Sequence, residues 1–175
     1  MQLYRSIDIP KQARNCILAI GNFDGVHLGH QAVIQEAKKI ALKENKKLGI
    51  LTFEPHPKSF FGNNRNNFRL TPFRIKFELI KKLNVDFYFN IRFNNNFSKT
   101  SAEKFIMEML VKKMRISHII TGFDFVFGSK KSGNVNLIKK LAKQTNLFEF
   151  HSVEEFKAKD LKKLSSSVVR TKLLS

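Results

Sequence analysis

Cysteine is almost absent from this chain of 175 residues, which contains only Cys16. A single thiol excludes an intrachain disulfide and any metal site built from several cysteines. No apolar run approaches the roughly 20 residues that span a bilayer, and the first residues lack the apolar core of a signal peptide. We therefore expect a soluble, cytoplasmic protein without a membrane partner.

Acidic residues are also scarce, because 14 Asp and Glu stand against 32 Lys and Arg and leave a net charge of +18. Such a charge makes nucleic acid the first partner to consider. The lysines, however, are scattered in pairs along helical patterns, such as Lys38-Lys39 and Lys112-Lys113. This arrangement is typical of solvated helix faces. We interpret the charge as a surface that attracts small anions, and nucleic acid is not the expected partner.

Apolar residues make up 42% of the chain and include 18 Phe, enough for the core of one full-sized domain. Short apolar runs alternate with helical patterns, so residues 1–175 are predicted to form one α/β domain. Its expected fold is a Rossmann-like five-stranded parallel sheet with helices on both faces. The strands are expected at residues 16–20, 48–53, 85–91, 117–121 and 147–151, and the helices at 29–44, 72–83, 101–114, 135–143 and 165–174.

In such sheets ligands bind at the carboxyl ends of the strands, where the strand order reverses. The first predicted strand ends there in GNFDGVHLGH, residues 21–30. Three glycines permit a tight turn, and His27 and His30 lie three residues apart at the start of a helix, on one face. The N–H groups and positive dipole end of that helix favour an anion. The segment predicts a phosphate site in which Gly29 leaves room for the phosphates; the alternative is a histidine pair in the core.

Other phosphate and metal motifs are missing. The sequence contains neither the Walker A pattern G-x-x-x-x-G-K-[ST] nor the dinucleotide fingerprint G-x-G-x-x-G. The two histidines also lack the spacing and the glutamate of the zinc-protease pattern H-E-x-x-H, so no metal ligands are assigned.

Four segments in order along the chain carry a resemblance to a known family. GNFDGVHLGH is similar to the signature of the HxGH nucleotidyltransferase superfamily. TFEPHP at residues 52–57, GFDFVFG at 122–128 and LSSSVVR at 164–170 follow it. Together they most resemble the FAD synthetase (FMN adenylyltransferase) domain of the prokaryotic bifunctional riboflavin kinase/FMN adenylyltransferase enzymes.

The resemblance implies transfer of AMP from ATP to FMN, giving FAD and pyrophosphate, with Mg²⁺ bound to the triphosphate. FMN brings the attacking oxygen, so catalysis would rest on positioning and on stabilisation of charge. The implied catalytic residues are His27, His30 and Arg170. The implied nucleotide-binding residues are Gly21, Phe23, Asp24, Gly29, Ser165 and Ser166. Asp24 has an alternative role, holding the turn by an Asx-type hydrogen bond.

The residues that the resemblance implies for flavin binding come from the second and third motifs. Its candidates are Phe53, Pro55, His56, Pro57, Asp124, Phe125 and Phe127. The prolines stiffen the loop around His56, and the alternating phenylalanines offer rings that stack on flavin or adenine. Val126 departs from the family pattern, because many relatives have arginine at that position.

The riboflavin kinase motif P-T-A-N of the family does not occur in the sequence. We therefore expect a single adenylyltransferase domain with the C-terminal riboflavin kinase domain absent and a separate kinase as the source of FMN. Three alternatives stay open: an HxGH adenylyl- or cytidylyltransferase with another phosphorylated acceptor, a basic nucleic-acid-binding module, or an inactive flavin-binding domain.

Overall fold

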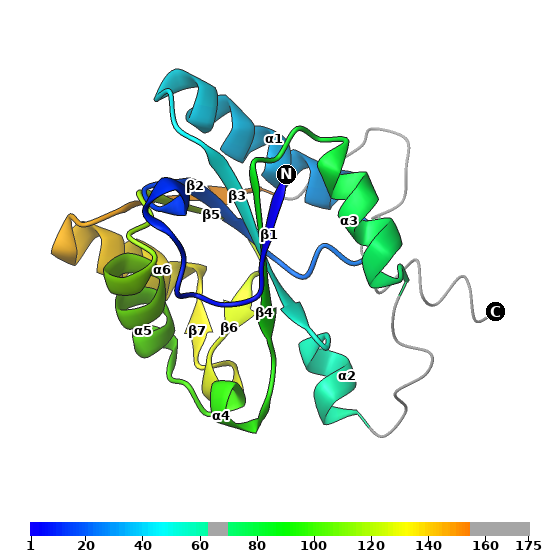
Figure 1. The fold of residues 1–175 in the computed structure, drawn as a ribbon. Coiled ribbons are helices and arrows are strands. Elements are labelled where there is room, and N and C mark those ends of the chain that lie inside the picture. The colour runs from blue at the N-terminus through cyan, green and yellow to red at the C-terminus, as the bar shows by residue number, and fades with distance from the viewer. Residues whose placement is uncertain (63–69, 155–175) are drawn as a thin grey trace.

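The computed structural model describes residues 1–62 and 70–154. At its centre lies a six-stranded parallel sheet with the order β1-β4-β3-β2-β5-β8 (Figure 1). The strands are β1 (Gln2–Tyr4), β2 (Ile17–Ile20), β3 (Leu48–Glu54), β4 (Phe87–Arg92), β5 (His118–Gly122) and β8 (Glu149–Val153).

The α/β class with a parallel sheet is confirmed, but the expected number of five strands is wrong. The additional strand, β1, pairs with β4 at one edge of the sheet. It has three residues, none of them fully buried, so it leaves no apolar run in the sequence.

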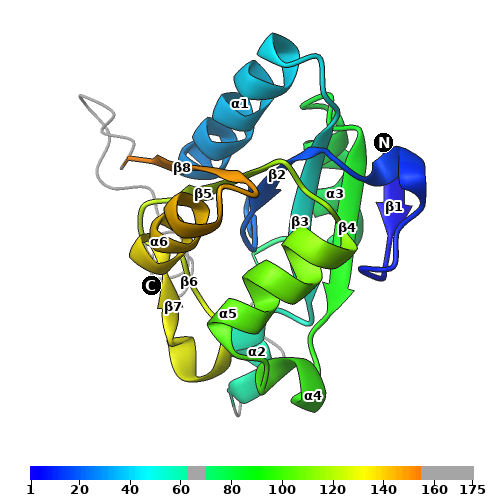
Figure 2. The same cartoon turned by 90° about the vertical axis from the view of Figure 1, so that its left-hand side faces the viewer.

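Helices cover both faces of the sheet (Figures 1 and 2). Helices α1 (Leu28–Lys43) and α3 (Phe73–Lys81) lie on one face. Helix α5 (Ala102–Lys104), continued by the π-helical segment η2 (Phe105–Lys113), and α6 (Val135–Thr145) lie on the other. The short elements are η1 (Lys11–Ala13), α2 (Pro57–Phe61), α4 (Asn95–Ser98), and the hairpin of β6 (Val126–Phe127) and β7 (Gly133–Asn134) around η3 (Ser129–Lys131).

Four expected helices are confirmed in position, although residues 105–113 are wound as a π-helix, which the apolar spacing does not indicate. The expected helix at residues 165–174 lies outside the described residues. Within residues 1–62 and 70–154, no helix has the length and apolar character that a bilayer span requires.

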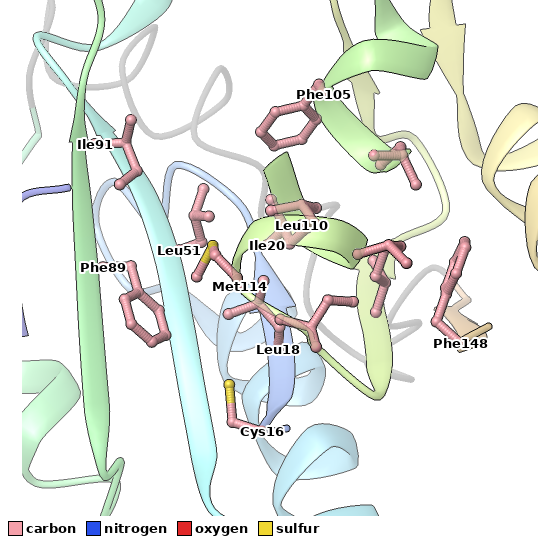
Figure 3. Close-up of a cluster of buried hydrophobic side chains, with 14 of the residues drawn as sticks. Cys16, Leu18, Ile20, Leu51, Phe89, Ile91, Phe105, Leu110, Met114 and Phe148 are labelled. Atoms are coloured by element: carbon pink, nitrogen blue, oxygen red, sulfur yellow. The ribbon is translucent and has the colours of Figure 1, made fainter. Parts of the chain in front are cut away.

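The central strands are buried on both faces. Leu18 and Ile20 of β2 join the cluster under η2 and α6, whereas Ile17 and Ala19 join the cluster under α1 and α3. Figure 3 shows the first cluster, in which Cys16 lies below Leu18. This double burial is the reason that the parallel strands read as continuous apolar runs.

The strand order reverses between β2 and β5. The chain runs from β2 through β3 to β4 on one side, and then crosses to β5 and β8 on the other side of β2. The loops after β2 and β5 therefore meet at the carboxyl edge, where a sheet of this kind binds its ligands.

The thiol of Cys16 is expected to be inert in the folded protein. The residue is fully buried, and this burial raises the pKa of the thiol to about 12. Since the thiolate is the reactive form, an aromatic disulfide reagent should not modify the native chain near neutral pH. One equivalent should react after unfolding in guanidinium, and rapid modification of the native chain would contradict the burial.

Candidate functional site

The loop between β2 and α1 has a strained backbone. Phe23 and Val26 have φ values of +48° and +38°, in the left-handed region that side chains disfavour, and Gly25 has +81°. Packing holds Phe23 in place, because its ring is 1% exposed and meets the His30 ring edge-on at 5.3 Å between centroids. A Cβ at Gly21 would approach the Phe23 ring to 3.2 Å, so glycine fits this close contact.

The carboxylate of Asp24 ties this loop to the segment before α3. The backbone N–H groups of Leu70 and Thr71 donate to it at 3.1 and 3.0 Å, and the Thr71 hydroxyl donates at 3.2 Å. The N–H of Gly25 donates to the same hydroxyl at 3.1 Å. The side chain is 3% exposed. These partners are far along the chain, so tertiary hydrogen bonds hold the turn.

The two histidines meet at the start of α1, as their spacing predicts. His27 is the N-cap residue and its Nδ1 accepts from the N–H of His30 at 3.4 Å. The two rings stack with centroids 3.6 Å apart. A Cβ at Gly29 would lie 3.3 Å from the His27 ring, so this glycine leaves room for the ring itself. Both histidines are partly exposed, which disfavours the alternative of a pair enclosed in the core.

A buried lysine also contacts this loop, and sequence reasoning missed it. Lys76 of α3 is 6% exposed, and its ammonium group donates to the backbone carbonyl of Asn22 at 3.2 Å. The amide Oδ1 of Asn22 is a buried atom with no hydrogen-bond partner among the described residues. The signal was present in the spacing, because Lys76 lies one turn before the buried Ile80.

The loop after β3 is arranged around His56, which is 8% exposed and follows a cis Glu54–Pro55 peptide bond. His56 caps α2, since its Nδ1 accepts from the N–H of Lys58 at 3.1 Å and its carbonyl accepts from the Ser59 hydroxyl at 3.0 Å. Pro57 begins α2, and Pro55 is exposed.

Phe53 precedes this loop and lies in the core. Its ring is 7% exposed and packs against Phe97 and Phe105 at 5.3 and 6.0 Å between centroids. The residue was predicted on the flavin side, but its burial places it beneath the loop.

Two strands next to the loops carry a buried polar group that sequence reasoning also missed. The Thr52 hydroxyl donates to the amide oxygen of Asn90 at 3.0 Å and lies 3.2 Å from the Tyr88 hydroxyl. The Asn90 Nδ2 has no hydrogen-bond partner in the part of the chain that the structure describes. The available signal in the sequence was Thr52, a polar residue near the end of an otherwise apolar strand.

The motif after β5 forms a turn and the first strand of the hairpin. Phe125 donates its N–H to the Gly122 carbonyl at 3.2 Å, and Asp124 is exposed. The rings of Phe125 and Phe127 stack on each other with centroids 5.3 Å apart. Phe127 is 8% exposed and faces Phe105, so it belongs to the core and the more exposed Phe125 lies above it.

The structure thus brings the first three motifs to one edge of the sheet, since β3, β2 and β5 are neighbouring parallel strands. The fourth motif, with Ser165, Ser166 and Arg170, lies outside the described residues. What is described is a helix N-terminus flanked by two imidazoles, an arrangement suited to an anion such as a phosphate.

Comparisons with known proteins identify relatives of this chain. The chain is 41% identical over 99% of its length to the bifunctional riboflavin kinase/FMN adenylyltransferase of Buchnera aphidicola from Schizaphis graminum, covering 56% of that protein. It is 34% identical over 99% of its length to the Escherichia coli K12 protein of the same name, covering 55% of it. The chain therefore spans about half the length of these curated relatives.

Solved structures share the fold. A structure titled macrolide-efflux protein, from Streptococcus pneumoniae, superposes with a TM-score of 0.83 at 23% identity, over 99% of this chain and 55% of that one. Pantothenate synthetase of Thermus thermophilus superposes with a TM-score of 0.61 at 14% identity, over 97% of this chain and 67% of that one. The FAD synthetase family model matches residues 9–168. Most of the chain lies within that match, and the chain belongs to the FAD synthetase family.

Proposed function

We propose that this chain is an FMN adenylyltransferase, which transfers AMP from ATP to FMN and releases pyrophosphate. The observation that carries the proposal is the stacked pair His27–His30 at the start of α1, beside the point where the strand order reverses. Family membership and the names of the curated relatives support the choice of FMN as the acceptor.

In this reaction an oxygen of the FMN phosphate attacks the α-phosphorus of ATP. A new P–O bond forms between the FMN phosphate and the α-phosphorus. The bond from the α-phosphorus to the oxygen that bridges it to the β-phosphate breaks, and pyrophosphate leaves with the Mg²⁺ that entered with ATP. No protein nucleophile is needed. The protein contributes by holding the two phosphates in line and by stabilising the charge on the leaving group.

The phosphate site is formed by α1 and the loop before it. The imidazole N–H groups of His27 and His30 donate to phosphate oxygens, and the helix dipole adds to the attraction. Gly21, Phe23, Asp24 and Gly29 shape the nucleotide pocket: the glycines through close contacts, Phe23 by supporting His30, and Asp24 by fixing the loop. Lys76 is a positioning residue, because it bonds the carbonyl of Asn22 within the same loop.

The fourth motif would supply a second set of phosphate contacts. We propose that Ser165 and Ser166 supply hydroxyl and backbone donors, and that Arg170 supplies a planar fork for two oxygens of the leaving pyrophosphate.

On the flavin side, we propose direct contacts from the loop of Pro55, His56 and Pro57 and from Asp124 and Phe125. These residues follow β3 and β5, on either side of the phosphate site. Phe53 and Phe127 support them from the core instead, since both rings pack against Phe105. FMN would be supplied by a riboflavin kinase, an activity that the curated relatives carry in their names.

The first test is direct. The purified chain, incubated with ATP, Mg²⁺ and FMN, should produce FAD and one equivalent of pyrophosphate, resolved by chromatography with flavin fluorescence. Riboflavin in place of FMN should give no product, because it lacks the attacking phosphate. Pyrophosphate release with a different phosphorylated acceptor, but not with FMN, would contradict the proposal.

The phosphate contacts are tested with His30→Ala and Arg170→Ala. Loss of one preorganised donor to a charged transition state costs about 2.7–4 kcal/mol, so each variant should lower kcat by about 10²–10³-fold. Lys39→Ala is the matched control on α1, where the Lys39 side chain is 76% exposed. Circular dichroism checks that the variants are folded. If both variants keep the wild-type rate, the proposed phosphate contacts of His30 and Arg170 are wrong.

Asp24→Ala should lower both stability and ATP binding. The change leaves the partly buried N–H donors of Leu70 and Thr71 without their acceptor, at up to about 1–3 kcal/mol for each group. We expect a fall in Tm of roughly 5–15 °C, by the usual scaling for domains of this size, and a raised KM for ATP. Asp8→Ala, at a carboxylate whose side chain is 78% exposed, is the control for stability. An unchanged Tm would show that the anchor is dispensable.

A further inference from the structure

Two histidines and two glutamates that the proposed reaction does not use gather at the opposite end of the sheet. His118 begins β5 and Glu149 begins β8, and the two residues are paired in register across the strands. His151 lies two residues beyond Glu149, on the same face, because side chains alternate along a strand. Glu44 is the C-cap residue that follows α1, and α1 packs over β5 and β8 (Figure 2).

The donor atoms of this group converge. The Nε2 of His118 lies 3.3 Å from a carboxylate oxygen of Glu149 and 3.0 Å from one of Glu44, and the Nε2 of His151 lies 3.6 Å from Glu149. One donor atom from each of His118, Glu149 and His151 lies within 4.8 Å of the others. A tetrahedral zinc ion with bonds of about 2.0–2.1 Å separates its ligands by about 3.3–3.4 Å. The distances of 3.3 and 3.6 Å from Glu149 to the two imidazoles lie close to that spacing.

The His118 ring is held by a partner that leaves Nε2 to face the carboxylates. Its side chain is 4% exposed, and its Nδ1 lies 3.1 Å from the Ser117 hydroxyl, which donates to the Cys16 carbonyl at 3.3 Å. The Ser117 oxygen can accept the hydrogen of Nδ1, and in that tautomer Nε2 keeps its lone pair for a metal ion. Nε2 lies close to the carboxylates of Glu44 and Glu149. Nε2 is indeed a buried atom without a hydrogen bond among the described residues.

A cleft gives a cation access to these groups. Glu44 and Glu149 supply carboxylates to it, Lys46 and Arg115 also line it, and the ammonium of Lys46 lies 2.7 Å from Glu44. His118, Glu149 and Glu44 line a cleft of about 440 Å³, which gives an ion and its waters a way in.

We propose that His118, Glu149 and His151 form a binding site for a divalent transition metal ion, zinc foremost, with Glu44 as a neighbouring carboxylate. Two imidazoles and a carboxylate are ligands that zinc accepts readily. Ser117 is a positioning residue, since the partner of the second ring nitrogen fixes a metal-binding histidine. The site lies at the amino ends of β5 and β8, whereas the proposed nucleotide site lies at the carboxyl ends of the strands.

The test is a titration of the EDTA-treated chain with ZnCl₂ by calorimetry, and with Co²⁺ followed by its visible absorption. We expect saturable binding with the absorption of tetrahedral cobalt. The changes His151→Gln and Glu149→Gln should each weaken this binding by at least about 100-fold, and Ser117→Ala by about 10–100-fold. The side chains of His151 and Glu149 are 41% and 68% exposed, so both variants should fold.

Two controls make the result specific. Glu108→Gln, at an exposed glutamate of η2 that pairs with Lys112, should bind zinc as the unchanged chain does. His27→Gln tests the other close histidine pair, and the cluster should keep its zinc in that variant. The proposal is overturned if no saturable binding occurs, or if the zinc survives in His151→Gln and disappears in His27→Gln.

Discussion

The buried carboxylate of Asp24 is the interaction on which the carboxyl edge of the sheet depends. The loop after β2 holds Phe23 and Val26 in left-handed backbone conformations, each at a cost of about 1–3 kcal/mol. Hydrogen bonds to a charged group contribute about 1.5–3 kcal/mol each, and Asp24 accepts from two backbone N–H groups and a hydroxyl. The two sums are comparable, so the strained loop persists because this anchor offsets it.

The parallel sheet separates two kinds of chemistry by its direction. At the carboxyl ends, helix α1 begins with its positive dipole end and two imidazoles, an environment for anions. The same helix ends at Glu44 near the amino ends of β5 and β8, where carboxylates and imidazoles face one another. The helix dipole is negative at that end, which adds to the attraction for a cation. One helix of 16 residues thus connects the proposed phosphate site with the proposed metal site.

The features that could be predicted from the sequence are those that appear as local patterns of residues. Strands such as β3 and β5 were found because burial on both faces makes them continuously apolar, and the histidine pair because three residues make most of a helical turn. The edge strand β1 was not found, since its partner β4 is more than 80 residues away and supplies its hydrogen bonds. The hydrogen bonds of Asp24 were missed for the same reason, because its partners Leu70 and Thr71 lie 46 and 47 residues further along the chain.

Lys76 shows where composition misleads. In a chain with 32 lysines and arginines, a lysine within a helix is interpreted as part of a solvated face. Yet Lys76 is buried beside the loop, and its ammonium group donates to the backbone carbonyl of Asn22 at 3.2 Å. A buried ammonium needs such an acceptor, and a strained loop exposes carbonyls that a regular element would have used. The backbone strain of the loop after β2 and the burial of the Lys76 ammonium group beside it therefore follow from the same backbone geometry. No single residue in the sequence encodes that geometry.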